Sequence, residues 1–243
     1  MEPIRLYLGL GDTLSVDPHP EGPGWGACSL LARNRDESYP DFAGRDLASG
    51  APEITVACLA RAGATTRGVL EEQLFRLPAD RGGRTVVTLT AGSNDLLLTL
   101  RLRGTLLEED GEAVVRRLRS MVASIHSRLH HGLILLATLV DPSDGVGDLL
   151  AAGQPLIRGL DVVARVNDAI RALAAEGDGT MLIDLHAAFL GHGSHARDPR
   201  NPYHHPNDPS AWLGDLVAPN RHGADAIRRL WWQALVQAGW VEG

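Results

Sequence analysis

The feature that most constrains the fold of this sequence is the alternation of short apolar runs with stretches of helical periodicity. Short, continuous apolar runs bounded by turn residues are typical of strands buried on both faces. Such runs occupy residues 4–10, 54–59, 85–90, 133–139 and 180–185. Apolar residues at helical spacing fall in residues 65–76, 111–130, 159–176 and 223–238. Strands that alternate with helices predict an α/β protein with a five-stranded parallel sheet between two helical layers.

The length of the chain allows one large domain of this kind. With 243 residues, of which 44% are hydrophobic, the chain can bury a sizeable core, and we expect a single domain over residues 1–243. The segment at about 190–214 is different, because it is rich in His and Pro and lacks periodicity. We expect it to be a long loop, and such loops in compact domains are often functional. Ligands of parallel sheets bind beyond the carboxyl ends of the strands, so the residues after each apolar run are the candidates for a site.

Charge and residue usage exclude several classes of function. All 23 residues counted as lysine or arginine are arginines, so the chain contains no lysine. Walker-type phosphate loops and Schiff-base chemistry need lysine and are excluded. The formal net charge of −7 argues against a general nucleic-acid binder, whose surface is basic. The start of a dinucleotide-binding glycine pattern is incomplete, because its third glycine position is Leu14. We therefore expect neither a nucleic-acid partner nor a cofactor.

The sequence also bears on cellular context. No apolar run reaches the ~18 residues that a transmembrane helix needs. The N-terminus lacks the basic start and apolar stretch of a signal peptide, so we expect a cytoplasmic protein. Cys28 and Cys58 are too few for a disulfide framework and lie among apolar or small residues, so we expect both thiols to serve packing. Nothing in the sequence indicates an oligomeric state.

Four polar segments stand where a site is expected. Gly-Asp-Thr-Leu-Ser (residues 11–15), Ala-Arg-Ala-Gly-Ala-Thr-Thr (60–66) and Ala-Gly-Ser-Asn-Asp (91–95) follow the first three runs. Asp-Leu-Val-Ala-Pro-Asn-Arg-His-Gly (215–223) precedes the last helical stretch. In this order, over nearly the whole chain, the four segments resemble the motifs of the SGNH/GDSL hydrolase family. The resemblance implies the SGNH hydrolase fold, a flavodoxin-like, three-layer α/β/α sandwich.

The resemblance carries catalytic roles onto four residues. It places Thr13 at the nucleophile position, Gly63 and Asn94 in the oxyanion hole, and Asp215 at the triad acid. A glycine lets its N–H approach a substrate closely, and one side-chain donor in an oxyanion hole is typically worth ~3 kcal/mol in the transition state. The acid would orient and stabilise a protonated imidazole. Neighbouring motif residues in supporting positions are Asp12, Ser15, Asp95 and Asn220.

Two residues depart from the family pattern and leave the general base open. Thr13 stands in place of serine, and its extra methyl crowds the path of attack. Ala218 stands where the family has its histidine, so the base is a relocated histidine, a carboxylate, or absent. Arginine stays protonated and cannot replace it. We favour His192, which is flanked by glycines, with His222 as the alternative, and Ser15 as an alternative attacking hydroxyl.

Some of these polar residues have simpler interpretations. Five of the ten histidines fall between residues 186 and 205 and could bind zinc with a nearby aspartate, but no recognised ligand spacing occurs, so we predict no metal site. Asn94 and Asp95 also suit a helix N-cap, because an apolar run follows them. Asp141 and Asp144 are interpreted as turn formers after the fourth strand.

The sequence therefore predicts a hydrolase of carboxylic esters, of esterase, lipase or acyltransferase type, whose partner is a small-molecule ester. The alternative is a catalytically silent SGNH-like module that binds a small acylated or glycosylated ligand, and the motif departures at Thr13 and Ala218 motivate it.

Overall fold

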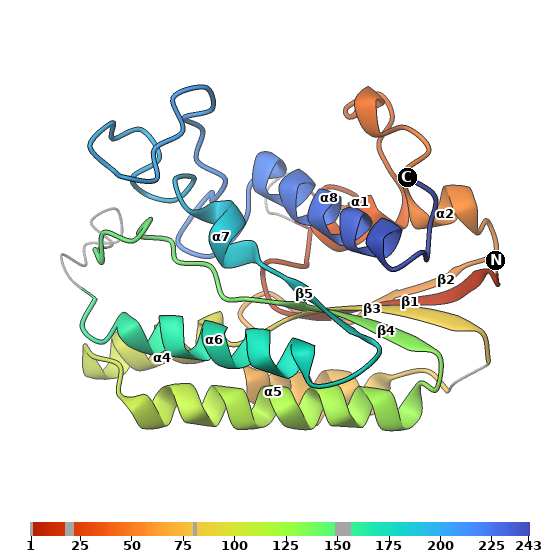
Figure 1. Ribbon diagram of the computed structural model, residues 1–243, viewed down its shortest axis with the longest axis horizontal. Coiled ribbons are helices and arrows are strands. Elements are labelled where there is room, and N and C mark those ends of the chain that lie inside the picture. The colour runs from red at the N-terminus through yellow and green to blue at the C-terminus, as the bar shows by residue number, and fades with distance from the viewer. Residues whose placement is uncertain (1, 18–21, 80–81, 149–156) are drawn as a thin grey trace.

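The computed structural model describes residues 2–17, 22–79, 82–148 and 157–243, and its centre is a five-stranded parallel sheet (Figure 1). The strands are β1 (Ile4–Gly11), β2 (Thr55–Cys58), β3 (Arg84–Thr90), β4 (Gly132–Ala137) and β5 (Thr180–Ile183). Their order in the sheet is β2-β1-β3-β4-β5, and all four neighbouring pairs are parallel. The predicted number and parallel arrangement of the strands are confirmed.

Helices cover both faces of the sheet (Figure 1). One layer contains α4 (Ser93–Arg103), α5 (Glu108–Arg128) and α6 (Asp161–Ala175), and the opposite layer contains α1 (Ala27–Ala32), α2 (Leu47–Gly50), α7 (Leu185–Phe189) and α8 (Arg221–Gln237). A short 3-10 turn, η1 (Pro40–Phe42), lies between α1 and α2 in the chain. The predicted three-layer sandwich is confirmed.

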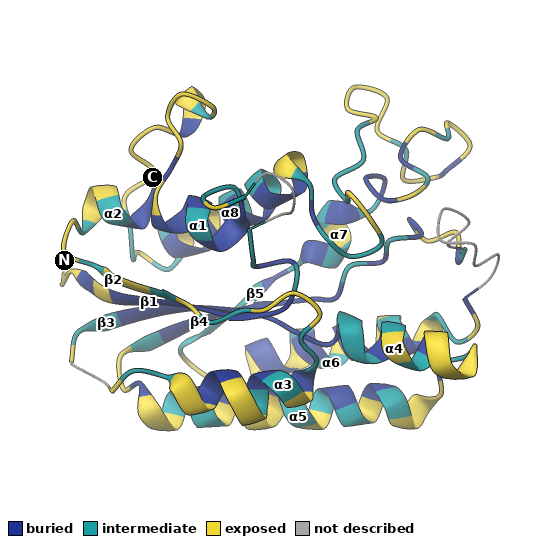
Figure 2. Cartoon of the chain, turned by 180° about the vertical axis from the view of Figure 1, so that it is seen from behind, coloured by how far each residue is buried: buried dark blue, intermediate teal, exposed yellow. Residues whose placement is uncertain are grey.

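The hydrophobic core consists of two clusters, one under each helical layer. Along β1, Leu6, Leu8 and Leu10 belong to the cluster with α4–α6, whereas Tyr7 belongs to the cluster with α1 and α8. Both faces of the central strands are therefore buried, as the dark strands of Figure 2 show, which explains their continuous apolar runs. The edge strand β2 differs, because its Val56 is 44% exposed.

Two helical segments differ from expectation. Residues 65–76 are not one regular helix but α3 (Thr66–Gly68), a π-helical turn η2 (Val69–Gln73) and a 3-10 turn η3 (Leu74–Arg76). Within it, the Gln73 amide donates to the Gly11 carbonyl oxygen and accepts from the Gly11 N–H, both at 2.8 Å. Helix α4 was not predicted as a helix of its own, because its leucines surround the axis instead of forming one stripe: Leu96 and Leu100 are buried, while Leu98 and Leu102 are exposed.

The chain reverses its direction across the sheet between β1 and β3. After β1 the chain runs to β2 at one edge, and after β2 it returns to β3 on the other side of β1. The helices that follow β1 and β3 lie on opposite faces of the sheet (Figure 1). The carboxyl ends of β1 and β3 therefore form the crevice in which ligands of such sheets bind. Among the described helices, none is long and apolar enough to cross a membrane.

Candidate active site

Thr13 lies in the loop that follows β1, with its side chain half-buried. The loop leaves the strand at Gly11, whose φ of +123° favours glycine, and a Cβ there would lie 1.8 Å from the Thr90 carbonyl oxygen. Gln73 holds the same glycine from the other side. The Thr13 hydroxyl oxygen accepts a hydrogen bond from the Gly63 N–H at 3.0 Å. The predicted nucleophile and the predicted oxyanion donor are thus in direct contact.

Gly63 owes its place to backbone conformation and not to crowding. Its φ is +74°, and nothing lies within 4 Å of the position that a Cβ would take. A turn closed by the Ala64 N–H donating to the Arg61 carbonyl at 3.1 Å holds this segment after β2. The left-handed φ thus favours glycine at this position, and the Gly63 N–H points to Thr13, while the close approach of a substrate stays a prediction.

Asn94 stands in the first turn of α4, beside the same turn. Its Nδ2 donates to the Ala64 carbonyl oxygen at 3.0 Å, which places the amide next to Gly63. An amide nitrogen carries two hydrogens, so one remains for an oxyanion. The interpretation of Asn94 as the helix N-cap is wrong, because Gly92 occupies the N-cap and no side chain caps α4.

Asp95 fixes the geometry of these two elements. Its carboxylate accepts from the Thr66 N–H and from the Thr66 hydroxyl, both at 2.7 Å, and Arg117 Nη1 lies 3.4 Å away. The bonds join the start of α3 to the start of α4. They hold the segment that carries Gly63 against the helix that carries Asn94, so Asp95 is a positioning residue and not the second N-cap candidate.

Asp12 and Ser15 are buried inside the nucleophile loop. The Asp12 carboxylate accepts from the Leu14 N–H at 3.1 Å and from the Thr90 hydroxyl at 2.9 Å. Burial raises the pKa of Asp12 to about 7, although these two hydrogen bonds oppose the shift. The Ser15 hydroxyl is fully buried and lies 2.8 Å from the Thr90 hydroxyl. In this conformation Ser15 offers no hydroxyl to a substrate, and both residues support the loop.

The C-terminal motif forms a turn without a catalytic pair. Asp215 is exposed, and its Oδ1 accepts from the backbone N–H groups of Val217 and Ala218 at 2.9 and 2.8 Å. Asn220 caps α8 by accepting from the His222 and Gly223 N–H groups at 2.9 and 3.2 Å. The carboxylate predicted to orient an imidazole is bonded instead to its own turn.

The two histidines proposed as the base lie in different surroundings. His192 is 5% exposed, with its ring stacked between Trp212, at 3.6 Å between centroids, and His205, at 4.7 Å. Its Nδ1 lies 2.9 Å from the Ser210 carbonyl oxygen, which can only accept, so Nδ1 carries the proton and Nε2 has the free lone pair. His222 is exposed in the first turn of α8.

The rings of His192 and His222 both lie near the carboxylate of Asp208. A hydrogen bond from Ser210 lowers the pKa of Asp208, and electrostatic interaction with the nearby His192 and His222 lowers it further. Within the part of the chain that the structure describes, however, no histidine forms a hydrogen bond with Thr13. The structure thus brings together the residues predicted as nucleophile and oxyanion donors, and neither histidine predicted as the base is bonded to Thr13.

Sequence reasoning missed the residue that organises the histidine loop. Residues 190–220 connect α7 to α8 without a helix or regular strand. Asp144, buried and in the left-handed region with φ 53°, accepts from the N–H groups of Gly191, Gly193 and His195 at 2.9, 2.7 and 2.8 Å. Asp141 is a local turn former as predicted, bonded to the Ser143 and Gly145 N–H groups. No signal in the sequence links Asp144 to a loop more than forty residues away.

Two cavities lie beside α4 and the C-terminal motif. One, of about 50 Å³, is apolar and is lined by Ser93, by leucines of α4 and by Val217. The other, of about 620 Å³, is lined by Arg101, Arg197 and Asp215, and it shares Val217 and Pro142 with the first. The Ser93 hydroxyl is buried without a partner in the described structure. Across the described ranges, no three potential metal ligands come together.

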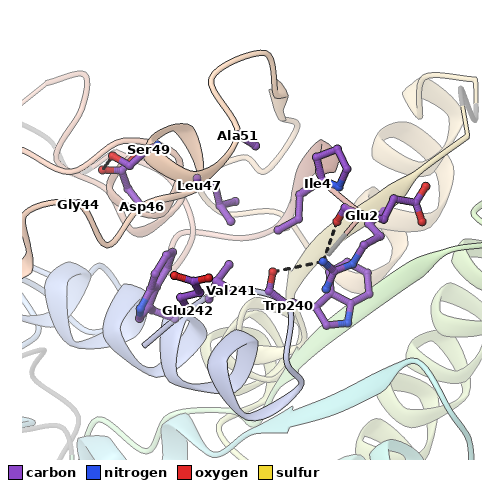
Figure 3. A pocket seen from close by; sticks show the side chains of 14 residues that line it. Glu2, Ile4, Gly44, Asp46, Leu47, Ser49, Ala51, Trp240, Val241 and Glu242 are labelled. Atoms are coloured by element: carbon purple, nitrogen blue, oxygen red, sulfur yellow. Dashed lines mark hydrogen bonds between the residues drawn. The ribbon is translucent and has the colours of Figure 1, made fainter.

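A further cavity lies at the opposite end of the sheet. Its volume is about 410 Å³, and Figure 3 shows side chains from both ends of the chain around it, including Glu2, Trp240 and Glu242. Arg84 closes one side by donating from Nη1 to the Glu2 and Trp240 carbonyl oxygens. Because Ile4 and Arg84 begin β1 and β3, this cavity is at the amino ends of the strands, away from Thr13.

Similar solved structures place this arrangement among known folds. The Bacillus subtilis protein YxiM is 21% identical with a TM-score of 0.57, and the match covers 98% of this chain and 57% of that one, so the chain spans little more than half of YxiM. LAE5, an alpha/beta hydrolase enzyme from the metagenome of Lake Arreo, Spain, is 18% identical with a TM-score of 0.61 over 100% of this chain and 99% of its own. The acetylxylan esterase Axe2 from Geobacillus stearothermophilus is 19% identical with a TM-score of 0.59, covering 99% and 98%. No curated protein matches the sequence.

The five-stranded parallel α/β/α sandwich, with Thr13 and Gly63 in contact at its switch point, has the SGNH hydrolase fold. Residues 19–212 match the GDSL-like Lipase/Acylhydrolase family, and the chain belongs to this family. The matched range includes Gly63 and Asn94 but neither Thr13 nor Asp215. It therefore leaves out the two segments in which the sequence departs from the family motifs.

Proposed function

We propose that the protein hydrolyses carboxylic esters, or transfers their acyl groups, with the Thr13 hydroxyl as nucleophile. The hydrogen bond from the Gly63 N–H to the Thr13 hydroxyl, with the Asn94 amide bonded to the next residue, is the observation that carries this proposal. In the reaction Thr13 Oγ1 bonds to the ester carbonyl carbon, and the carbonyl oxygen takes the negative charge between the two donors. The alcohol leaves with a proton, and water or another alcohol then takes the acyl group from Thr13.

His192 is the base that we propose, with His222 as the alternative. The Nδ1 bond to the Ser210 carbonyl gives the imidazole of His192 the tautomer that a base acting through Nε2 needs. In this conformation the ring is held in the stack with Trp212 and His205, so the loop has to open before Nε2 can take the Thr13 proton. Catalytic contacts often tighten only when substrate binds. His222 is exposed and free of such a stack.

The acyl group is proposed to be short. The apolar cavity beside Ser93 measures about 50 Å³, a few times the ~10–15 Å³ that one water molecule needs on the same measure. A group of a few heavy atoms, such as an acetyl group, fits that space. The likeness to Axe2, which is an acetylxylan esterase, supports the same choice. The larger cavity beyond Val217 is proposed to take the alcohol part of the ester.

A silent ligand-binding module is the second candidate, because Ala218 supplies no base and Asp215 is bonded to its own turn. Hydrolysis of p-nitrophenyl acetate by the full chain separates the two. We expect turnover that falls about 10²–10³-fold in Asn94→Ala, the usual effect of removing an oxyanion donor, and falls to background in Thr13→Ala. Ser127→Ala, an exposed hydroxyl on α5, is the control and should keep full activity.

Turnover that survives Asn94→Ala and Thr13→Ala unchanged would place the chemistry elsewhere. A chain that turns over no ester, but whose melting temperature rises with an acetylated oligosaccharide, would support the silent module.

A further inference from the structure

The two cysteines converge on one point of the sheet, although they belong to different elements. Cys28 is in α1 and Cys58 is the last residue of β2, while Gly9 of β1 is the register partner of Cys58. A Cβ on Gly9 would lie 2.3 Å from Cys28 Sγ and 3.3 Å from Cys58 Sγ. Both sulfur atoms therefore occupy the space above Gly9 that a side chain would otherwise fill. The expectation that both thiols serve packing holds for Cys28, which is buried, but not for Cys58, which is exposed.

The two thiols differ in their exposure to solvent and in the direction of their pKa shifts. Cys58 is on the edge strand β2 and is open to solvent, whereas Cys28 is 1% exposed. The Cys28 thiol donates toward the Cys58 sulfur, which lowers the pKa of Cys58 and, together with burial, raises the pKa of Cys28 well above its usual range. Thiolate character and access, the two properties that decide thiol reactivity, thus coincide at Cys58.

We propose that Cys28 and Cys58 form a thiol–disulfide redox site that reacts with small-molecule disulfides such as oxidised glutathione. Cys58 Sγ attacks one sulfur of the reagent, whose S–S bond breaks, and the first small thiol leaves with the Cys58 proton. Cys28 Sγ then attacks Cys58 Sγ and expels the second small thiol, which takes the Cys28 proton. The protein dithiol is oxidised to a disulfide by two electrons, and one small disulfide is reduced to two thiols.

The bond joins the two segments that frame the candidate active site. The nucleophile loop lies between β1 and α1, and Gly63 lies five positions after Cys58. A Cys28–Cys58 disulfide would therefore connect α1, which follows the loop that carries Thr13, to β2, which precedes the turn that carries Gly63. Because β2 is a four-residue strand at the edge of the sheet, it is the element that would move to bring the two sulfur atoms to disulfide geometry. The redox site stands on these contacts and does not depend on the proposed esterase activity.

The test is incubation of the full chain with oxidised glutathione, followed by thiol counting after denaturation and by intact mass. We expect both thiols to disappear, the mass to fall by two hydrogens, and the melting temperature to rise by about 5–10 °C, as a loop-closing bond does. Reduction should reverse all three. Cys28→Ala should stop at a stable glutathione adduct on Cys58, and Cys58→Ser should give no adduct, because Cys28 is buried.

Gly9→Ala is the geometric control, since it keeps both thiols and places a methyl group in the space that the sulfurs share. Disulfide formation should then slow at least tenfold or stop at the mixed disulfide. A wild-type chain that keeps both thiols, or that ends with a stable glutathione adduct on Cys58 and a free Cys28, overturns the proposal. Equal rates in the wild type and Gly9→Ala would also overturn it, because the disulfide would not depend on the arrangement above Gly9.

Discussion

At the scale of single residues, Asp12 holds the loop that carries Thr13 and also has a raised pKa, which makes stability depend on pH. It is adjacent to Thr13, but its carboxylate points into the protein and bonds to the Leu14 N–H and the Thr90 hydroxyl. Burial is the main cause of its raised pKa of about 7, and the charge of Asp95 adds to it. The protonated form is therefore favoured in the folded protein, and ionisation of Asp12 opposes folding.

This shift predicts how stability depends on pH. Because the folded pKa of Asp12 lies above the unfolded value, its contribution to stability is complete below about pH 4 and is lost as the pH rises through about 7. The shift of about three pKa units corresponds to a loss of up to about 4 kcal/mol. An asparagine side chain cannot ionise, so Asp12→Asn should gain stability relative to the wild type by up to that amount between about pH 4.5 and pH 8.

Urea unfolding of both proteins at several pH values measures this difference. Subtracting the wild-type curve removes the titration of other groups, including Asp144, whose pKa burial also raises. A difference in unfolding free energy that stays constant with pH would contradict the assignment of the raised pKa to Asp12.

The residues of the candidate site were predictable only where a local motif follows a strand. Thr13, Gly63 and Asn94 are of this kind, and the structure brings them together. The bonds from Thr66 to Asp95 and the carboxylate of Asp144 were not predictable, because they join segments far apart in the chain. Nothing in a single sequence marks such pairs.

At the scale of elements, the Asp144 carboxylate makes three of the bonds that attach the histidine loop, residues 190–220, to the segment after β4, beside the two bonds from Ser194 to the Pro142 carbonyl oxygen. The Asp144 carboxylate gathers three N–H groups, those of Gly191, Gly193 and His195. His192 lies within this span, so the position of the proposed base depends on a residue after β4.

Replacing this carboxylate should loosen the loop without disturbing its own turn. Asn tolerates the left-handed conformation of position 144 nearly as well as Asp. Its amide nitrogen cannot accept, so Asp144→Asn leaves at least one of the three N–H groups unpaired, at a cost of about 1–3 kcal/mol. Hydrogen exchange of peptides that cover residues 188–200 should become faster.

Asp198→Asn is the matched control, because Asp198 is in the same loop and its carboxylate accepts from the backbone and side-chain N–H groups of Arg200, two residues away. It should leave the exchange of residues 188–195 unchanged. Equal protection of those residues in Asp144→Asn and the wild type would show that the loop is held by other contacts.

The elements themselves were predictable in proportion to their burial pattern. The central strands and α5, α6 and α8 have continuous or one-sided apolar patterns and were predicted to within a few residues. Helix α4 was not predicted because leucines lie on all its sides. Residues 65–76 were predicted as one helix because the spacing of their apolar residues does not reveal the hydrogen bonds between Gln73 and Gly11.

At the scale of the whole molecule, the parallel sheet and its switch point determine which residues can meet. Thr13, Gly63 and Asn94 follow three neighbouring strands and converge because β1 lies between β2 and β3. In our proposal the general base comes from the C-terminal segment, which adds no strand to the sheet. The fold therefore brings together Thr13, Gly63 and Asn94, the proposed nucleophile and oxyanion donors, whereas the proposed base depends on the segment in which Ala218 departs from the family motif.

The departure at Ala218 leads to a prediction about adding a histidine at this position. The Asp215 turn is already formed around position 218, and its Oδ1 is bonded while Oδ2 is left for an imidazole. If the absent histidine limits the rate, Ala218→His combined with Thr13→Ser should raise kcat/KM for p-nitrophenyl acetate about 10²–10⁴-fold, the usual contribution of a positioned general base. Thr13→Ser alone should give a much smaller gain, because the hydroxyl would still lack a base.

The opposite pattern identifies a relocated base. If His192→Ala abolishes the activity of the wild type while Ala218→His adds nothing, His192 is the proton acceptor. The base then comes from the histidine loop and not from position 218. His222→Ala separates the two histidine candidates, because only one of them can be essential in that case. The chain contains no lysine that could act instead, so a wild-type activity that survives both histidine changes would point to another histidine of residues 186–205, to a carboxylate, or to catalysis without a general base.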